Sequence, residues 1–552
     1  MKIKQVVLFL FFISSLVNMS VGQVSSMPRL AYNNGIYQLM VNDEPYLILG
    51  GELMNSSGFD LDYMDNAWGK VAELNVNTIF IPISWQQFEP EEGKFDSSYL
   101  ETHILNARKH NLKLVILWFG SWKNGVSTYA PEWVLSNTER FPRVLDQNGK
   151  AKNVLSIFSE ETKRADAKAF QQLLTDIKRI DEKDHTVVMV QVENEVGLFE
   201  QSRDFSPQAN KAFNENVPEN FLDYLRKNHK QLTPHLTKML GSKIGSGSWE
   251  KMFGSNLFTD ELFMAYNYAS YIEAVAKNGK SVYPLPIMAN AWLDDPVNPV
   301  PGKHLSGGPV ARVLDAWMAA SPNIDIYSPD IYHLKIEDFT KVCADYCHRK
   351  NPLLIPECSA IWLFDTLSAP AKAFYSIAQQ NAIGFSPFGI DHATYHLGHP
   401  LHNAYAVLRD LSDLILEKQG TKQIKGFIEG EEKIDTINMS NYRFVIDYNV
   451  VREENELGYG LIIQTNSDEF IFSGIGFNVE FLPEVAGKSG VSILKTSSIR
   501  KDKNNQWESY RLNGGDETLW MGKCGLKFPP NPYDIGMNYN DITIQKVKLY
   551  RY

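Results

Sequence analysis

The sequence predicts an α/β protein, a (β/α)8 TIM barrel followed by a C-terminal antiparallel β-sandwich. Between about residues 30 and 415, eight short runs that are apolar nearly throughout alternate with amphipathic stretches. That pattern is typical of parallel strands buried on both faces and separated by helices. After about residue 420, short runs alternate apolar and polar residues instead. Such alternation indicates antiparallel strands with only one buried face.

The eight apolar runs are the expected barrel strands. They cover residues 46–49, 76–83, 112–119, 187–192, 285–289, 324–327, 353–355 and 383–388. Helix-like segments lie between them, among them 97–110, 161–179 and 259–277. Eight alternations favour a closed barrel. An open doubly wound sheet is the alternative, but no glycine-rich phosphate loop follows the early runs, which counts against it.

The predicted domains follow from these patterns. Residues 23–415 form the catalytic barrel and residues 416–552 the β-sandwich. A polar stretch over about 198–280, rich in Pro, Gly and Ser, interrupts the barrel after its fourth strand. We expect it to be either an elaborated loop near the barrel mouth or a plain helical insertion.

Residues 1–22 read as a secretory signal peptide. Lys2 and Lys4 precede an apolar run, and Ser20-Val21-Gly22 offers a small-x-small cleavage site. The apolar run is too short to span a bilayer, and no other stretch is long and apolar enough to do so. No cysteine follows directly after the run, so a lipid anchor is not expected. The mature protein is therefore expected in the periplasm or outside the cell.

Composition excludes several classes of protein. The 552 residues carry 54 Lys and Arg against 65 Asp and Glu, a net charge of −11. A nucleic-acid partner is not expected, because such proteins normally carry a basic excess or stripe. Aromatic residues make up 12% of the chain, which suits a carbohydrate enzyme and equally suits large aromatic cores. The four cysteines are expected to be free thiols, mostly buried.

Two expected strands end in carboxylates. The fourth runs into Gln191-Val192-Glu193-Asn194-Glu195, and the seventh into Ile355-Pro356-Glu357. Barrel enzymes place catalysis at the carboxyl ends of their strands, and glycosidases need two carboxylates across the scissile bond. Glu193 and Glu195 have the same strand parity, so spacing alone does not choose between them. The alternative for each Glu is an ion pair with a neighbouring Arg or Lys.

The ordered strand-end motifs resemble glycoside hydrolase family 35, the β-galactosidase family of the retaining (β/α)8 clan. The resemblance covers about residues 35–395. Its segments are Gly50-Gly51-Glu52, Trp85 through Glu89-Pro90 with Phe95-Asp96, Gln191 through Gly197, and Ile355-Pro356-Glu357 with Trp362 through Asp365. The resemblance implies that Glu195 is the acid/base, Glu357 the nucleophile, and Asn194 the residue that bonds the sugar 2-hydroxyl.

Further substrate-binding residues are expected near the strand ends. Trp122 and Trp362 are expected to stack on the sugar, with packing in the barrel wall as the alternative for each. Tyr332 is expected to hydrogen-bond the nucleophile, and Tyr327 competes for that role. Glu52 and Asn290 complete the expected binding set.

Three strand ends depart from the family pattern. Lys123-Asn124 stands where the family has an Asn-Ala-Glu element, Pro82 stands where many members place a sugar-contacting Tyr, and the Asn290 element lacks its Asp. We expect a divergent bacterial branch. Asp391-His392, at the end of the eighth run, is expected to line the pocket.

The sequence therefore predicts a retaining exo-β-glycosidase, most specifically a β-galactosidase that acts on a galactoside. The alternatives are a β-glucosidase or glucanase, a β-mannosidase, or a non-catalytic carbohydrate-binding protein. No cofactor and no metal are implied, because the histidines lack a third ligand at suitable spacing. No oligomeric state follows from the sequence.

Overall fold

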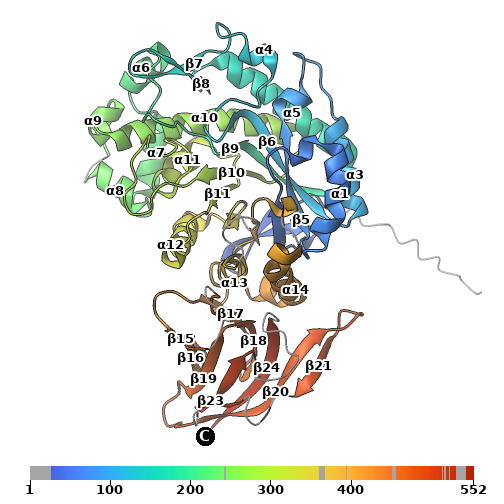
Figure 1. Ribbon diagram of the computed structural model, residues 1–552. Coiled ribbons are helices and arrows are strands. Elements are labelled where there is room, and N and C mark those ends of the chain that lie inside the picture. The colour runs from blue at the N-terminus through green and yellow to red at the C-terminus, as the bar shows by residue number, and fades with distance from the viewer. Residues whose placement is uncertain are drawn as a thin grey trace, which may run out of the picture.

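The computed structural model describes residues 26–552 except 242–243, 360–366, 393–394, 451–455, 513, 515–517, 521–522 and 530–541. The predicted signal peptide, Trp362 and residues 363–365 therefore lie outside the described residues. Figure 1 shows a large α/β body joined to a smaller all-β unit that contains the C-terminus.

Eight parallel strands form the barrel, in the order β11-β10-β9-β6-β5-β4-β13-β12. Their bounds are β4 (Ile48–Glu52), β5 (Thr78–Ser84), β6 (Lys113–Lys123), β9 (Val187–Asn194), β10 (Ile287–Trp292), β11 (Ile326–Asp330), β12 (Leu354–Ile355) and β13 (Gly384–Phe385). The ring closes between β11 and β12, where the Ile331 amide donates to the Glu357 carbonyl at 3.0 Å. Each strand overlaps one of the eight predicted runs, and the predicted barrel is confirmed.

A small antiparallel sheet closes the amino-terminal end of the barrel. It comprises β1 (Arg29–Asn33), β2 (Ile36–Val41) and β3 (Glu44–Pro45). Leu39 and Val41 of β2 pack in the same buried cluster as Ile48, Phe80 and Val115 from the barrel strands. Apolar side chains therefore fill this end of the barrel interior, and polar strand ends are left at the opposite end.

Helices surround the barrel (Figure 1). They are α1 (Leu61–Ala72), α2 (Trp85–Phe88), α3 (Ser98–Lys109), α4 (Glu132–Leu135), α5 (Glu160–Asp181), α10 (Leu257–Val282), α11 (Leu314–Ala320), α12 (Ile336–Tyr346), α13 (Ala369–Gln379) and α14 (Tyr395–Lys418). The long helix α5 begins where the Ser159 side chain accepts from the Thr162 amide, an N-cap that satisfies one free donor. Its buried face packs against α10.

The polar stretch after the fourth barrel strand is largely helical. It contains α6 (Pro207–Asn214), α7 (Glu219–Asn228), α8 (Pro234–Leu240) and α9 (Trp249–Phe253), and runs into α10. Ser206 and Thr233 cap α6 and α8, each followed by a proline that suits the first helical turn. A short hairpin, β7 (Arg143–Leu145) with β8 (Ala151–Leu155), lies between α4 and α5.

Two antiparallel sheets form the C-terminal unit, as predicted. Their orders are β14-β17-β18-β24-β20-β21 and β15-β16-β19-β23-β22. The bounds are β14 (Ile424–Ile428), β15 (Ile434–Met439), β16 (Tyr442–Asp447), β17 (Tyr459–Asn466), β18 (Glu469–Ile475), β19 (Phe477–Pro483), β20 (Val491–Lys501), β21 (Trp507–Leu512), β22 (Leu519–Trp520), β23 (Lys523–Phe528) and β24 (Thr543–Arg551).

Aromatic side chains such as Phe444, Phe472 and Phe481 form the core of this unit. Strands β14 and β17 pack against α13, which attaches the unit to the barrel. Cys343, Cys347 and Cys524 are free thiols, and Cys343 and Cys358 are buried. Among the described residues, no helix combines the length and the apolar character that crossing a bilayer needs.

Candidate active site

The backbone at the end of β9 separates the two glutamates that strand parity could not distinguish. Glu193 and Glu195 both have left-handed backbones, with φ of 59° and 47°. Such a conformation is uncommon for a residue with a side chain, and it clusters at functional sites. The regular alternation of side chains ends here, so the two carboxylates point into different surroundings.

Glu193 holds the neighbouring strand in place. Its two carboxylate oxygens accept from the backbone amides of Ser121, at 3.2 Å, and Trp122, at 2.8 Å, both on β6. Burial, followed by the charge of nearby Asp166, raises the pKa of Glu193 well above its ordinary value. Both oxygens of this carboxyl group are therefore occupied by hydrogen bonds from the backbone of β6.

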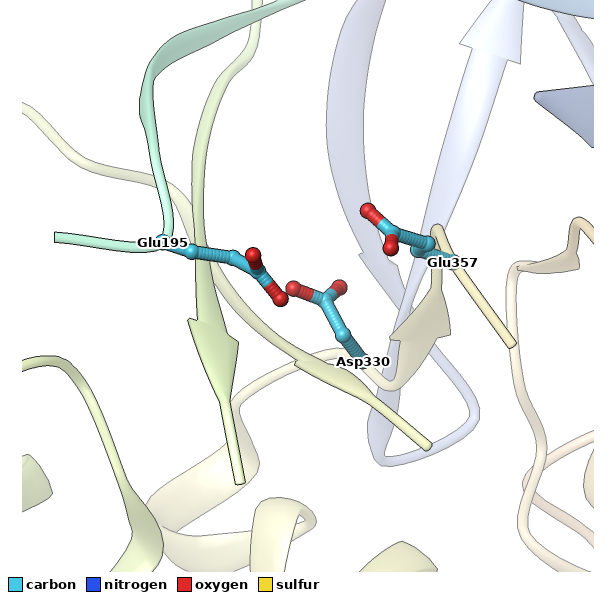
Figure 2. A group of neighbouring side chains, drawn as sticks. All are labelled: Glu195, Asp330 and Glu357. Carbon is cyan, nitrogen blue, oxygen red and sulfur yellow. The ribbon is translucent and has the colours of Figure 1, made fainter. Parts of the chain in front are cut away.

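Glu195 lies instead at the barrel mouth with two other acids. Figure 2 shows the Glu195 and Asp330 carboxyl groups directed toward each other, with Glu357 beside them. One carboxylate oxygen from each of the three lies within 4.8 Å of the others, and all three residues are buried. They follow β9, end β11 and follow β12, respectively, so three strand ends build the cluster.

Protons reduce the negative charge of this cluster. Burial and the charge of Glu357 raise the pKa of Glu195 to about 8. Burial and the charges of Glu357 and Glu195 raise the pKa of Asp330 well above its ordinary range, and its carboxyl hydrogen-bonds Glu195. Burial and Glu357 likewise raise the pKa of Glu52, the last residue of β4. All three carboxyls are therefore shifted toward the protonated form, and Glu195, with a pKa of about 8, is mainly protonated at neutral pH.

Lys123, the last residue of β6, is a buried cation beside these acids. Burial alone would lower the pKa of Lys123. The surrounding charges of Glu357, Glu195, Glu52 and Asp330 outweigh that effect and raise it. The lysine therefore stays charged and offsets negative charge at the mouth of the barrel.

Tyr332 occupies the position predicted for it. Its hydroxyl donates to Glu357 Oε1 at 2.5 Å. Burial and the charge of Glu357 raise the pKa of Tyr332, so the phenol stays protonated and remains a donor. The competing residue, Tyr327, bonds Ser321 instead.

Asn290 and Asn194 connect the strand ends around Glu195. The Asn290 side chain accepts from the Glu195 amide at 2.9 Å and donates to Asp330 Oδ2 at 2.8 Å. Asn194 Oδ1 accepts from Gln191 at 2.9 Å, and its amide nitrogen donates to Asn124 at 3.2 Å. This network fixes the backbone of Glu195 and the side chain of Asp330.

The expected stacking role of Trp122 does not fit the structure. Its side chain is 0% exposed, donates to the Leu155 carbonyl at 3.1 Å, and packs edge-on against Tyr268 and Tyr271. A ring enclosed in this way has no free face for a sugar. Asp391 likewise accepts from the Met54 amide, the Ser57 hydroxyl and the Tyr63 hydroxyl, and so holds the segment after β4.

Sequence reasoning missed two residues of the cluster, Asp330 and Lys123. Both end apolar barrel strands, which is the same signal that identified Glu195 and Glu357. Asp330 lies two residues before Tyr332, which was the residue expected to act at this strand end. Lys123 was treated only as a departure from a family pattern.

The spacing of Glu195, Asp330 and Glu357 would also suit a metal ion. Hard cations such as Mg²⁺ and Ca²⁺ prefer ionised oxygen ligands. The buried cation Lys123 already lies beside this cluster.

Paired buried carboxylates at the carboxyl ends of barrel strands are the arrangement that glycoside hydrolases use. Residues 60–252 match the profile of a family described as "Beta-galactosidase", glycoside hydrolase family 42. The chain therefore carries a β-galactosidase-like glycoside hydrolase domain. Residues 401–522 match a domain of unknown function (DUF5597).

The predicted resemblance to glycoside hydrolase family 35 is not supported, because the matching profile is that of family 42. Strand-end carboxylates are shared by barrel hydrolases in general, so the motifs indicate the class more firmly than one family. No curated protein matches the sequence.

Several solved structures are similar to this chain. A β-galactosidase from Bacillus circulans sp. alkalophilus is 14% identical with a TM-score of 0.47, and the match covers 67% of this chain and 57% of that one. A β-galactosidase from Rahnella sp. R3 is also 14% identical, with a TM-score of 0.45 and the same coverages. A β-mannanase from the blue mussel Mytilus edulis is 12% identical with a TM-score of 0.42, covering 70% of this chain and 97% of that one.

Proposed function

We propose that this protein is an exported, retaining exo-β-galactosidase that releases terminal β-D-galactosyl residues from oligo- or polysaccharides. The glycoside hydrolase class follows from the domain match. The sugar, the residue roles and the export are the proposed parts. The small-x-small motif Ser20-Val21-Gly22 supports cleavage of a signal peptide near Gly22.

The distance between the Glu195 and Glu357 carboxylates is the observation that supports the proposed mechanism. Glu195 and Glu357 each place an oxygen within 4.8 Å of the other. Retaining glycosidases hold their carboxyl groups about 5–5.5 Å apart, whereas inverting enzymes leave roughly 6.5–9.5 Å for a water molecule. An approach of the nearest carboxylate oxygens to within 4.8 Å is compatible with the retaining spacing and supports double displacement through a covalent intermediate.

In the first step Glu357 attacks the anomeric carbon and the glycosidic bond breaks. Glu195, protonated at neutral pH because its pKa is about 8, donates its proton to the departing oxygen. Tyr332 orients the nucleophile by its hydrogen bond to Oε1. In the second step the ionised Glu195 takes a proton from water, which attacks the glycosyl ester and releases the sugar with its configuration retained.

Azide rescue tests these roles. Glu357→Ala removes the nucleophile, so turnover should stop even for a dinitrophenyl galactoside, and any azide rescue should give the α-galactosyl azide. Glu195→Ala should still be galactosylated by the dinitrophenyl substrate, whose leaving group needs no proton. Azide should then restore turnover and give the β-galactosyl azide. Glu193→Ala tests the rival glutamate of the same strand end: it should lose stability, because two backbone amides lose their acceptor, and azide should not restore its turnover.

Product stereochemistry decides the outcome. A β-azide from Glu357→Ala, or full activity of Glu195→Ala on unactivated galactosides, would overturn the assigned roles. A panel of nitrophenyl glycosides tests the sugar. Preference for the glucoside or mannoside would indicate a β-glucosidase or glucanase, or a β-mannosidase. Sugar binding without any turnover would indicate a carbohydrate-binding protein.

A further inference from the structure

Two large aromatic side chains are exposed beside the carboxylate cluster. Trp292 is 39% exposed and Phe199 is 48% exposed. Their ring centroids lie 6.4 Å apart with 32° between the planes. Single exposed apolar residues are common. Two aromatic rings in contact at the mouth of the barrel, however, form an exposed patch of the kind that marks a binding site.

The strand geometry places Trp292 over the site. Trp292 is the last residue of β10 and shares the parity of Asn290, whose side chain bonds Asp330 within the cluster. Residues two apart on a strand face the same side. In the β10–β11 register, Trp292 also lies opposite Asp330. The indole therefore projects from the edge of the cluster toward the solvent.

Phe199 follows Glu195 by four residues and stands on a fixed backbone. Leu198 and Ser306 exchange two backbone hydrogen bonds of 2.9 Å, and the Glu200 amide donates to the Gly302 carbonyl at 2.7 Å. The chain on both sides of Phe199 is thus held, while its ring stays exposed. A preorganised ring loses little conformational freedom when a ligand binds.

We infer that Trp292 and Phe199 form the binding site for the leaving sugar, so that the preferred substrate is a galactoside whose aglycone is itself a pyranose. This inference rests on the proposed function, in which Glu195 protonates the departing oxygen. The aglycone must lie on the side of that acid. Phe199 belongs to the segment that follows Glu195, and Trp292 to the strand whose Asn290 bonds the Glu195 amide at 2.9 Å. Flat aromatic faces pack against the apolar face of a sugar ring.

Substrates with and without a leaving sugar test this site. β-Galactosyl fluoride fills only the glycone position, whereas lactose also places a pyranose on the leaving side. The quantity to compare is the ratio of kcat/KM for lactose to kcat/KM for β-galactosyl fluoride. Trp292→Ala and Phe199→Ala should each lower this ratio roughly tenfold, equivalent to about 1.4 kcal/mol of transition-state binding.

Trp507→Ala is the matched control, because Trp507 is 38% exposed and lies on β21 of the C-terminal unit. It should leave the ratio unchanged. An unchanged ratio in both mouth variants, or an equal fall of both rates, would overturn the inference. Failure of the natural enzyme to hydrolyse galactosyl fluoride would instead refute the proposed sugar. The same ratio measured with glucosyl and mannosyl fluorides and the matching disaccharides would then still test the aromatic site.

Discussion

Proton donation by Glu195 sets a testable limit on activity at high pH. Burial and Glu357 raise its pKa from 4.5 to about 8. With that pKa, roughly nine-tenths of the enzyme carries the proton at pH 7 and about one-tenth at pH 9, against about 0.3% at pH 7 for an ordinary glutamate. For a substrate that needs the proton, kcat/KM should therefore fall about tenfold between pH 7 and pH 9.

We call this fall of kcat/KM at high pH the alkaline limb. Two substrates distinguish it from a general loss of activity. Lactose needs protonation of its leaving oxygen, whereas dinitrophenyl galactoside does not. Initial rates of galactose release between pH 5 and pH 10 should show the alkaline limb in kcat/KM for lactose only. Preincubation at each pH, followed by assay at pH 7, checks that the enzyme survives. A limb below pH 6, or the same limb for both substrates, would refute the assignment.

Lys123 provides a second arm of the experiment. Its positive charge lowers the pKa of Glu195, so Lys123→Met should move the alkaline limb to higher pH. Lys113→Met is the matched control, because Lys113 begins the same strand, β6, at the opposite end of the barrel. The control should leave the limb in place. A downward shift in Lys123→Met would contradict the electrostatic argument.

Three further results are expected. Tyr332→Phe removes the hydrogen bond to Glu357 and should lower kcat/KM for dinitrophenyl galactoside by roughly 10- to 100-fold. This fall corresponds to the loss of about 1.5–3 kcal/mol that is typical of a hydrogen bond to a charged group. An unchanged rate would argue against Tyr332 as the residue that orients the nucleophile. Glu193→Ala leaves two buried amides unpaired and should lower the free energy of unfolding by about 2–6 kcal/mol in urea denaturation, whereas lost activity at unchanged stability would point to a catalytic Glu193. Mass spectrometry of the exported protein should find an N-terminus near Gln23, and an intact Met1 or an attached lipid would refute export by cleavage.

The barrel could be predicted because its strands are buried on both faces. Such strands are continuous apolar runs, and all eight appear in the sequence as blocks of three to eight residues. In the C-terminal unit, β16 and β19 show a period of two because one of their faces is more exposed than the other. Strands β17 and β18 are instead buried along most of their length, and α13 packs against β17. The sheet of β1, β2 and β3 was missed, because its strands are short and mix exposed with buried residues.

The site was predictable only as far as strand ends reveal it. Position along the chain identified Glu357 and the pair Glu193 and Glu195, but the choice within that pair depends on two left-handed backbone conformations that no local pattern announces. Trp122 was assigned wrongly because an aromatic residue at a strand end suits the barrel wall as well as a sugar. Its neighbour Lys123 faces the acids, and this difference between adjacent residues arises from tertiary packing alone.

The charges of the cluster suit every stage of the proposed double displacement. Burial and mutual repulsion raise the pKa values of Glu52, Glu195 and Asp330, so these carboxyls favour the protonated form beside the cation Lys123. Formation of the glycosyl ester neutralises Glu357 at the moment when Glu195 gives up its proton and becomes the anion. The negative charge thus moves from one carboxylate to the other, and Lys123 interacts with both. Because an unpaired buried charge is costly, the attraction of Lys123 to both carboxylates stabilises the negative charge on either of them.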